Sequence, residues 1–215
     1  RFAGSLALTC WQKALPEGEV RRLVGRFARA YLQQINHYLR TDDDTDFALH
    51  LDTASGPVLE ALKDARKIRR ADALDEMTSV RHGVRMFHDH ASVRRLGKRE
   101  HAQVMAAFET YLETIPDDKR FDRDLFYDVR DVVGKSGFGI GSAGLAAYNV
   151  LVEGYSQALD NDVVLSMKQA NVPALGRFVE VPAMDGYFEH EGHRTVESQR
   201  ALQAYTDPLL GHTTV

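Results

Sequence analysis

The sequence has very little cysteine and no long apolar run. Cys10 is its single cysteine, so no internal disulfide can form, and such scarcity is typical of a reducing compartment. No apolar stretch reaches the roughly 18 residues that a membrane-spanning helix needs. No charged-then-apolar leader follows Arg1. We therefore expect a cytoplasmic protein with neither a disulfide framework nor a membrane partner.

The sequence also lacks an excess of basic charge. Its 27 Lys and Arg residues and 31 Asp and Glu residues leave a net charge of -4, which gives no basic footprint for nucleic acid. A locally basic segment, KIRR at 67–70, is expected to be the solvated face of a helix. Apolar residues make up 44% of the sequence, as is ordinary for a globular protein. At 215 residues the chain is long enough for one large domain or two small ones. The sequence thus predicts no nucleic-acid partner and leaves the oligomeric state open.

Helical periodicity dominates residues 1–118. Apolar side chains recur at helical spacing over 17–39, with arginines opposite, and predict a long amphipathic helix. Ser55 and Pro57 are helix-start signals and predict a second helix that continues to Met77. The acidic segment TDDDTD at 41–46 lacks the glycine and the closing glutamate of a calcium loop, so we expect a solvated loop.

Three histidines lie in a short segment that breaks this helical pattern. Residues 79–97 carry Gly83 between short alternating runs, which indicates a small hairpin or an irregular excursion. His82, His88 and His90 could suggest a metal site, but an HxH pair needs further ligands in matching geometry. Surface histidines are the simpler interpretation, and we assign no metal ligand.

The pattern changes near residue 120. Strand-like runs at 145–154 and 163–169 follow a glycine-rich segment, and a final helix is expected over 192–205. We expect an α+β fold in which residues 1–118 are mainly helical. Residues 119–215 are expected to form a small antiparallel sheet and one helix.

The glycine-rich segment permits three interpretations. Gly139, Gly141 and Gly144 form a GxGxxG motif, but the Rossmann interpretation requires a helix after it, and a strand-like run follows here. A flexible turn would explain the glycines alone. The third interpretation is a loop between two strands that covers nucleotide phosphates with its backbone N–H groups.

The third interpretation requires a cation on the next strand and an acid on a later helix. Lys168 ends the run VVLSMKQ, on one strand face with Val164 and Ser166. Glu197 lies on an otherwise apolar stripe of the final helix, where an acid needs a cationic partner, and Lys168 is the natural candidate. Taken alone, each could be an ordinary surface residue, so the ordered set carries the interpretation.

Three stretches of the sequence resemble a known family. KSGFGIGSAGLAAYNVLVEG, DVVLSMKQANV and GHRTVESQRALQAYTDPLLG resemble the domain-of-unknown-function 2252 family, whose members look related to the protein kinase and aminoglycoside phosphotransferase superfamily. The resemblance implies a circularly permuted, protein-kinase-like fold. Residues 1–118 would be C-lobe-like, and 119–215 would be an incomplete, nucleotide-binding N-lobe.

The resemblance also implies roles for individual residues. Lys168 would orient the α and β phosphates of ATP, and Glu197 would orient Lys168. Ala146 stands where kinases usually have a valine against the adenine, which puts the identity of the nucleotide in doubt. The nucleotide-binding set would be Gly137, Gly139, Gly141, Ser142, Gly144 and Lys168.

Two motifs that the resemblance implies do not occur in this chain. The GDxHxxN-type and NDFD-type segments of such proteins are missing, so no residue is a convincing catalytic base or Mg²⁺ ligand. We expect a fragment of a protein that, when intact, transfers the γ-phosphoryl group of ATP, with magnesium, to an unknown small-molecule or protein acceptor. The alternatives are a noncatalytic pseudokinase or regulatory binding module, and a structural domain without a ligand.

Overall fold

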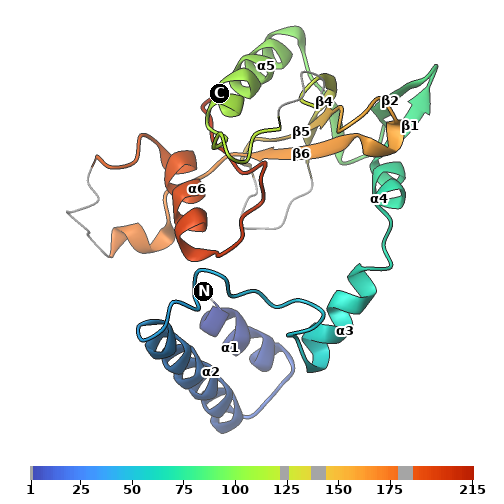
Figure 1. Cartoon of the computed structure of the whole chain (residues 1–215). Coiled ribbons are helices and arrows are strands. Elements are labelled where there is room, and N and C mark those ends of the chain that lie inside the picture. Colours follow the sequence, from blue (N-terminus) through green and yellow to red (C-terminus); the bar gives the residue numbers. More distant parts are fainter. Residues whose placement is uncertain (1, 122–125, 137–143, 179–185) are drawn as a thin grey trace. The chain divides into compact units, whose positions relative to one another are not determined.

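The computed structural model describes residues 2–121, 126–136, 144–178 and 186–215. The backbone separates into two units, residues 1–48 and 49–215. The described residues form six α-helices and two small antiparallel sheets (Figure 1), which confirms the predicted α+β class. No helix among the described residues is long and apolar enough to cross a membrane.

The first unit is a pair of helices, α1 (Phe2–Gln12) and α2 (Glu17–Tyr38). Pro16 directly precedes α2, and Glu17 and Glu19 lie in its first turn, where acidic side chains interact favourably with the helix dipole. The Phe2 and Phe27 rings pack together with centroids 4.7 Å apart. The long amphipathic helix predicted over 17–39 is confirmed.

The single helix predicted from Ser55 to Met77 is wrong, because two helices occupy this segment. They are α3 (Gly56–Ala65) and α4 (Arg70–Met77). The reason is tertiary: Arg70 donates hydrogen bonds to the backbone carbonyls of Asn161 and Asp162, at 2.5 and 2.7 Å. This anchor fixes the start of α4 against a distant loop.

A hairpin follows α4, which is one of the two alternatives that the sequence left open for residues 79–97. β1 (Thr78–Arg81) pairs antiparallel with β2 (Val84–Phe87). The two turn residues, His82 and Gly83, have φ angles of 51° and 79°. Positive φ at both positions is the geometry of the tight turns whose twist matches paired strands.

The larger sheet has the strand order β3-β4-β5-β6, and every neighbouring pair is antiparallel. Its strands are β3 (Val93–Arg95), β4 (Val129–Lys135), β5 (Ala147–Val152) and β6 (Val163–Lys168). Because β3 pairs with β4, the sheet uses residues on both sides of the expected division at 118. That division into two functional parts stays a prediction.

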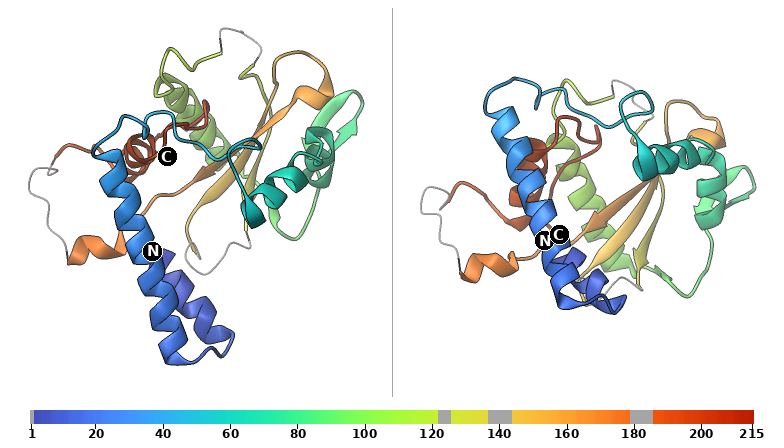
Figure 2. Two further views of the ribbon diagram at one scale, coloured as in Figure 1. Left: turned by 60° about the horizontal axis from the view of Figure 1, so that its bottom comes forward. Right: turned by 90° about the horizontal axis from the view of Figure 1, so that it is seen from below.

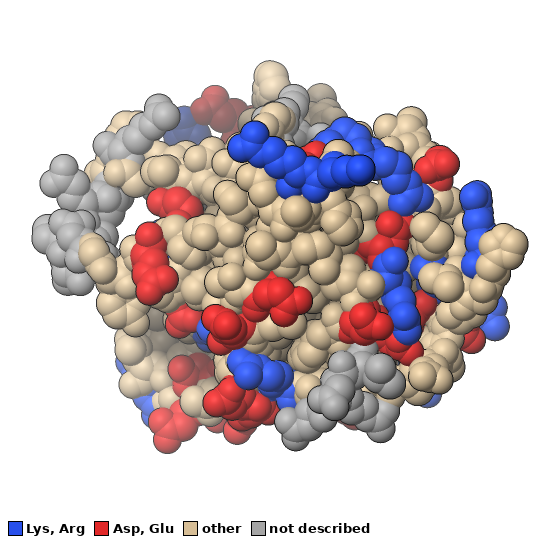
Figure 3. All heavy atoms as spheres, turned by 90° about the horizontal axis from the view of Figure 1, so that it is seen from above, with Lys and Arg blue, Asp and Glu red and all other residues tan. Residues whose placement is uncertain are grey.

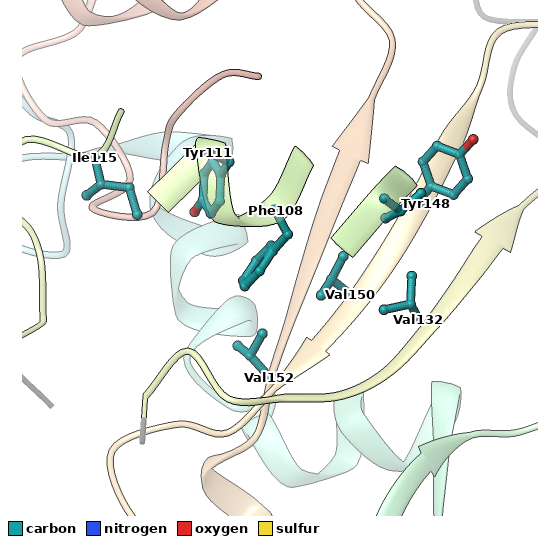
Figure 4. Packing of buried hydrophobic residues seen from close by; sticks show 8 residues of the cluster. Phe108, Tyr111, Ile115, Val132, Tyr148, Val150 and Val152 are labelled. Carbon is teal, nitrogen blue, oxygen red and sulfur yellow. The ribbon is translucent and has the colours of Figure 1, made fainter. Parts of the chain in front are cut away.

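One face of this sheet packs against α5 (Lys98–Glu113) and the residue Ile115 that follows it (Figure 4). Phe108 from α5 is 1% exposed and meets Val150 and Val152 of β5. Fully burying a side chain of this size stabilises the fold by about 1.5–3 kcal/mol. The buried cluster consists of Val104, Phe108, Tyr111, Ile115, Val132, Tyr148, Val150 and Val152.

The opposite face is covered by α4 and the β1–β2 hairpin over part of its length (Figure 2). Leu74 and Phe87 pack there against Val133 of β4 and Leu151 of β5. All six residues of β5 are buried because both faces of this strand are covered. Figure 3 shows acidic and basic side chains interspersed on one face of the molecule.

Candidate functional site

The site predicted from the glycine motif lies between two adjacent antiparallel strands. β4 ends at Lys135 and β5 begins at Ala147, so residues 136–146, called the glycine loop below, connect neighbouring strands. A strand follows the motif, whereas a dinucleotide-binding fold has a helix at this point. Gly144 has a φ of 81°, a conformation that glycine adopts without a Cβ clash. The other predicted loop residues, Gly137, Gly139, Gly141 and Ser142, lie outside the described residues.

A pair of hydrogen bonds ties the end of this loop to the end of β6. The Ala146 N–H donates to the Gln169 side-chain oxygen at 3.1 Å. The Gln169 N–H donates to the Ala146 carbonyl at 2.9 Å. The last loop residue is therefore held directly beside the strand that carries Lys168.

Lys168 lies next to the first residue after the loop. It is the last residue of β6 and pairs across the sheet with Ala147. Its side chain is exposed, and among the described residues it forms no ion pair. The strand order therefore places a lysine beside the residue at which the glycine loop ends.

A polar pair extends the strand face that carries Lys168. Ser166 pairs with Asn149 in the sheet, and its hydroxyl donates to the Asn149 side-chain oxygen at 3.1 Å. Asn149 is 5% exposed. The hydrogen bond offsets the cost of burying this amide and holds both side chains in place.

Sequence reasoning missed Lys135, which lies on the same sheet face as Lys168. Val133 belongs to the buried cluster on that face, and side chains two residues apart on a strand point the same way. The alternation in VVGK was visible in the sequence. The sequence could not show the strand register, and the register brings Lys135 and Lys168 to the same end of the sheet.

Glu197 lies on α6 (Glu191–Leu202) and is bound by a residue of its own helix. Arg200 donates to its carboxylate at 2.7 Å. No ion pair among the described residues joins Glu197 to Lys168, so their pairing stays a prediction. The helix ends at Leu202, earlier than the predicted Tyr205.

Arg200 also fixes α6 to its surroundings. It donates to the backbone carbonyls of Thr114 and Leu210, at 3.2 and 2.9 Å. Tyr111 of α5 donates to the Leu209 carbonyl at 2.6 Å, and burial raises the pKa of its hydroxyl. The position of Glu197 therefore depends on the segment that follows α6.

Three imidazole rings meet at the start of α6. The rings of His193 and His212 stack with centroids 4.6 Å apart, and the His190 ring centroid lies 5.1 Å from that of His212. His190 caps the helix, because its Nδ1 accepts from the N–H groups of Gly192 and His193. Burial lowers the pKa of His212, and the neighbouring His193 and His190 lower it further.

We expect this cluster to make stability depend on pH. Because the pKa of His212 is lower in the folded protein than its ordinary value of 6.5, the unfolded chain binds the proton more readily. The free energy of unfolding should therefore fall as the pH drops below about 6.5 and level off below the folded pKa. Urea unfolding at pH 7.5 and 5.5 measures this change.

His212→Gln should reduce the pH dependence, because glutamine does not titrate. His101→Gln is the matched control, since His101 is an exposed histidine on α5. An undiminished fall in stability in His212→Gln would contradict this account of the cluster.

The described residues contain no group of three or more His, Cys, Asp or Glu arranged to hold a metal ion. In the histidine-bearing segment after α4, the His90 Nδ1 is 3.0 Å from the Ser92 hydroxyl. Among the described residues next to Lys168 on its sheet face, the polar side chains are Asn149, Ser166 and a second lysine. These residues do not fit a Mg²⁺ site, which needs carboxylate or phosphate oxygens.

The opposite end of β6 is braced by a buried arginine. Arg85 is 3% exposed and donates to Asp75 at 2.6 Å and to the Leu159 carbonyl at 3.1 Å. The Asp162 carboxylate lies 3.5 Å from it. Burial raises the pKa of Asp162, and the charge of Arg85 opposes that rise. This network holds the connection between β5 and β6, and so positions the strand that carries Lys168.

No curated protein and no solved structure matches the chain. One family model does match, over residues 1–215, and it is described as an uncharacterized protein conserved in bacteria (DUF2252). The match spans the sheet, the glycine loop and α6 together. The chain therefore belongs to the DUF2252 family.

Proposed function

We propose that this chain is the nucleotide-binding part of a kinase-like phosphotransferase. The observation that carries the proposal is the pairing of Lys168 with Ala147, the first strand residue after the glycine loop. A strand, a glycine-rich loop, a second strand and a third strand ending in lysine form the arrangement with which kinases cover and neutralise nucleotide phosphates. We extend the proposal to the fold, as a circularly permuted relative of the protein kinases.

Each element has a defined chemical role in this proposal. The ammonium of Lys168 binds the α and β phosphates of ATP, while the N–H groups of the glycine loop donate to phosphate oxygens. Glu197 orients Lys168 when nucleotide is bound. For this, the Glu197 carboxylate must either break its ion pair with Arg200 or bind Arg200 and Lys168 together. Gln169 keeps the end of the loop beside Lys168 through its bonds to Ala146.

The transfer step itself is not assigned to residues of this chain. Glu197 is the one acid with a role in the proposed site, and one carboxylate is not a magnesium site. Since the acidic motifs of such enzymes do not occur in this sequence, we derive no step through Mg²⁺ or a catalytic base. The second candidate function is a nucleotide-binding module without phosphotransferase activity. The ion pair of Glu197 with Arg200 favours it, because that pair occupies the carboxylate that would orient Lys168.

Thermal unfolding with and without nucleotide tests the proposal. ATP should stabilise the protein, whereas adenosine at the same concentration should have a much smaller effect because it lacks the phosphates. A ligand at one hundred times its Kd stabilises the folded state by about 2.7 kcal/mol. Equal stabilisation by ATP and adenosine, or none by either at millimolar concentration, would contradict phosphate binding at this site.

A further inference from the structure

A row of four residues crosses the sheet at the end nearest the glycine loop. Val93 of β3 pairs with Lys135 of β4, and Ala147 of β5 pairs with Lys168 of β6. Because Gly134 pairs with Tyr148, the next residues along, Lys135 and Ala147, are also neighbours. Two lysines therefore flank one alanine in the row.

Both lysines lie on the same face of the sheet. Val93, Val133 and Val164 pack into the cluster that covers this face further along. Lys135 lies two residues after Val133, and Lys168 lies four residues after Val164, so strand alternation places them on this face too. Both lysines are exposed, whereas the alanine between them is 7% exposed.

The spacing of this row suits an anion longer than one phosphate. Neighbouring strands lie about 4.8 Å apart, so the backbones of Lys135 and Lys168 are separated by about 10 Å. Their flexible four-carbon stems allow the two ammonium groups to approach one ligand from both sides. Ala147 contributes only a methyl group between them, so no longer side chain separates the two lysines in this row.

Resting on the proposed function, we infer that Lys135 is a second phosphate-binding residue and that the site takes a nucleoside di- or triphosphate. Lys168 contacts the phosphates nearest the nucleoside, and Lys135 contacts those further along the chain. A monophosphate does not reach Lys135. The two lysines therefore select for the length of the phosphate chain.

Calorimetric titration of the whole chain with ATP, ADP and AMP tests this selection. Lys135→Gln should weaken ATP binding about tenfold, because one charge-assisted hydrogen bond is lost. The Kd for AMP should change less than about twofold, because AMP does not touch this residue. Lys135→Arg keeps the charge and should bind ATP close to the wild-type affinity.

Lys98→Gln is the matched control, because it removes the same charge from an exposed position at the start of α5. It should leave all three affinities unchanged. Wild-type ATP affinity in Lys135→Gln, or an equal loss for ATP and AMP, would overturn the role of Lys135. A wild-type protein that binds none of the three nucleotides would instead overturn the proposed function.

Discussion

Lys168→Ala should greatly reduce the stabilisation of this protein by ATP. Losing a hydrogen bond to a charged group costs about 1.5–3 kcal/mol, which weakens binding about 10- to 100-fold. At an ATP concentration that stabilises the wild type by about 2.7 kcal/mol, a 100-fold weaker variant would gain only about 0.4 kcal/mol. Thermal unfolding with a saturating series of ATP concentrations measures this difference.

The variant should fold normally, which separates this result from simple destabilisation. Lys168 is exposed at a strand end, and such surface substitutions usually change stability by less than about 0.5 kcal/mol. Lys63→Ala, which removes an exposed lysine from α3, should retain the full response to ATP. If Lys168→Ala responds to ATP like the wild type, Lys168 does not bind phosphate.

Arg85→Met should destabilise the fold severely. Methionine fills similar space but carries no charge. The buried Asp162 carboxylate would therefore lose the Arg85 cation that now lies beside it. Removing one partner of a buried ion pair costs about 3–5 kcal/mol. The hydrogen bonds to Thr78 and to the Leu159 carbonyl are lost as well. Urea unfolding at pH 7 measures the effect.

Arg81→Met provides the control on the same hairpin, because Arg81 is an exposed residue at the end of β1. It should change the free energy of unfolding by less than about 0.5 kcal/mol. A similarly small effect of Arg85→Met would show that the network around Asp162 does not brace the sheet.

The elements that the sequence predicted correctly are those set by local patterns. The periodicity over 17–39 predicted α2, and the alternation around Gly83 indicated either a hairpin, which the structure shows as β1–β2, or an irregular excursion. The helix break before Arg70 could not be predicted, because it accompanies hydrogen bonds to carbonyls at positions 161 and 162. Local propensity does not report such distant contacts.

The candidate site shows the same division between local and distant information. The order of glycine loop, lysine strand and helix could be read from the sequence. β5 and β6 lie within the runs expected at 145–154 and 163–169. The role inferred for Lys135 depends on strand register, which local patterns do not determine. The spacing of Glu197 and Arg200 on one helix allows an i,i+3 ion pair, which the structure shows. The order of loop, lysine and helix acid nevertheless favoured Lys168 as the partner of Glu197.

Affinity labelling tests most directly whether Lys168 lies against nucleotide phosphates. An ATP analogue with an acyl group on its terminal phosphate transfers that group to a nearby lysine amine, forming an amide and releasing the nucleotide. Peptide mass spectrometry then identifies the lysine. Labelling should concentrate on Lys168 and Lys135 and disappear in excess ATP. Equal labelling of exposed lysines such as Lys63 and Lys98, without protection by ATP, would contradict nucleotide binding at this site.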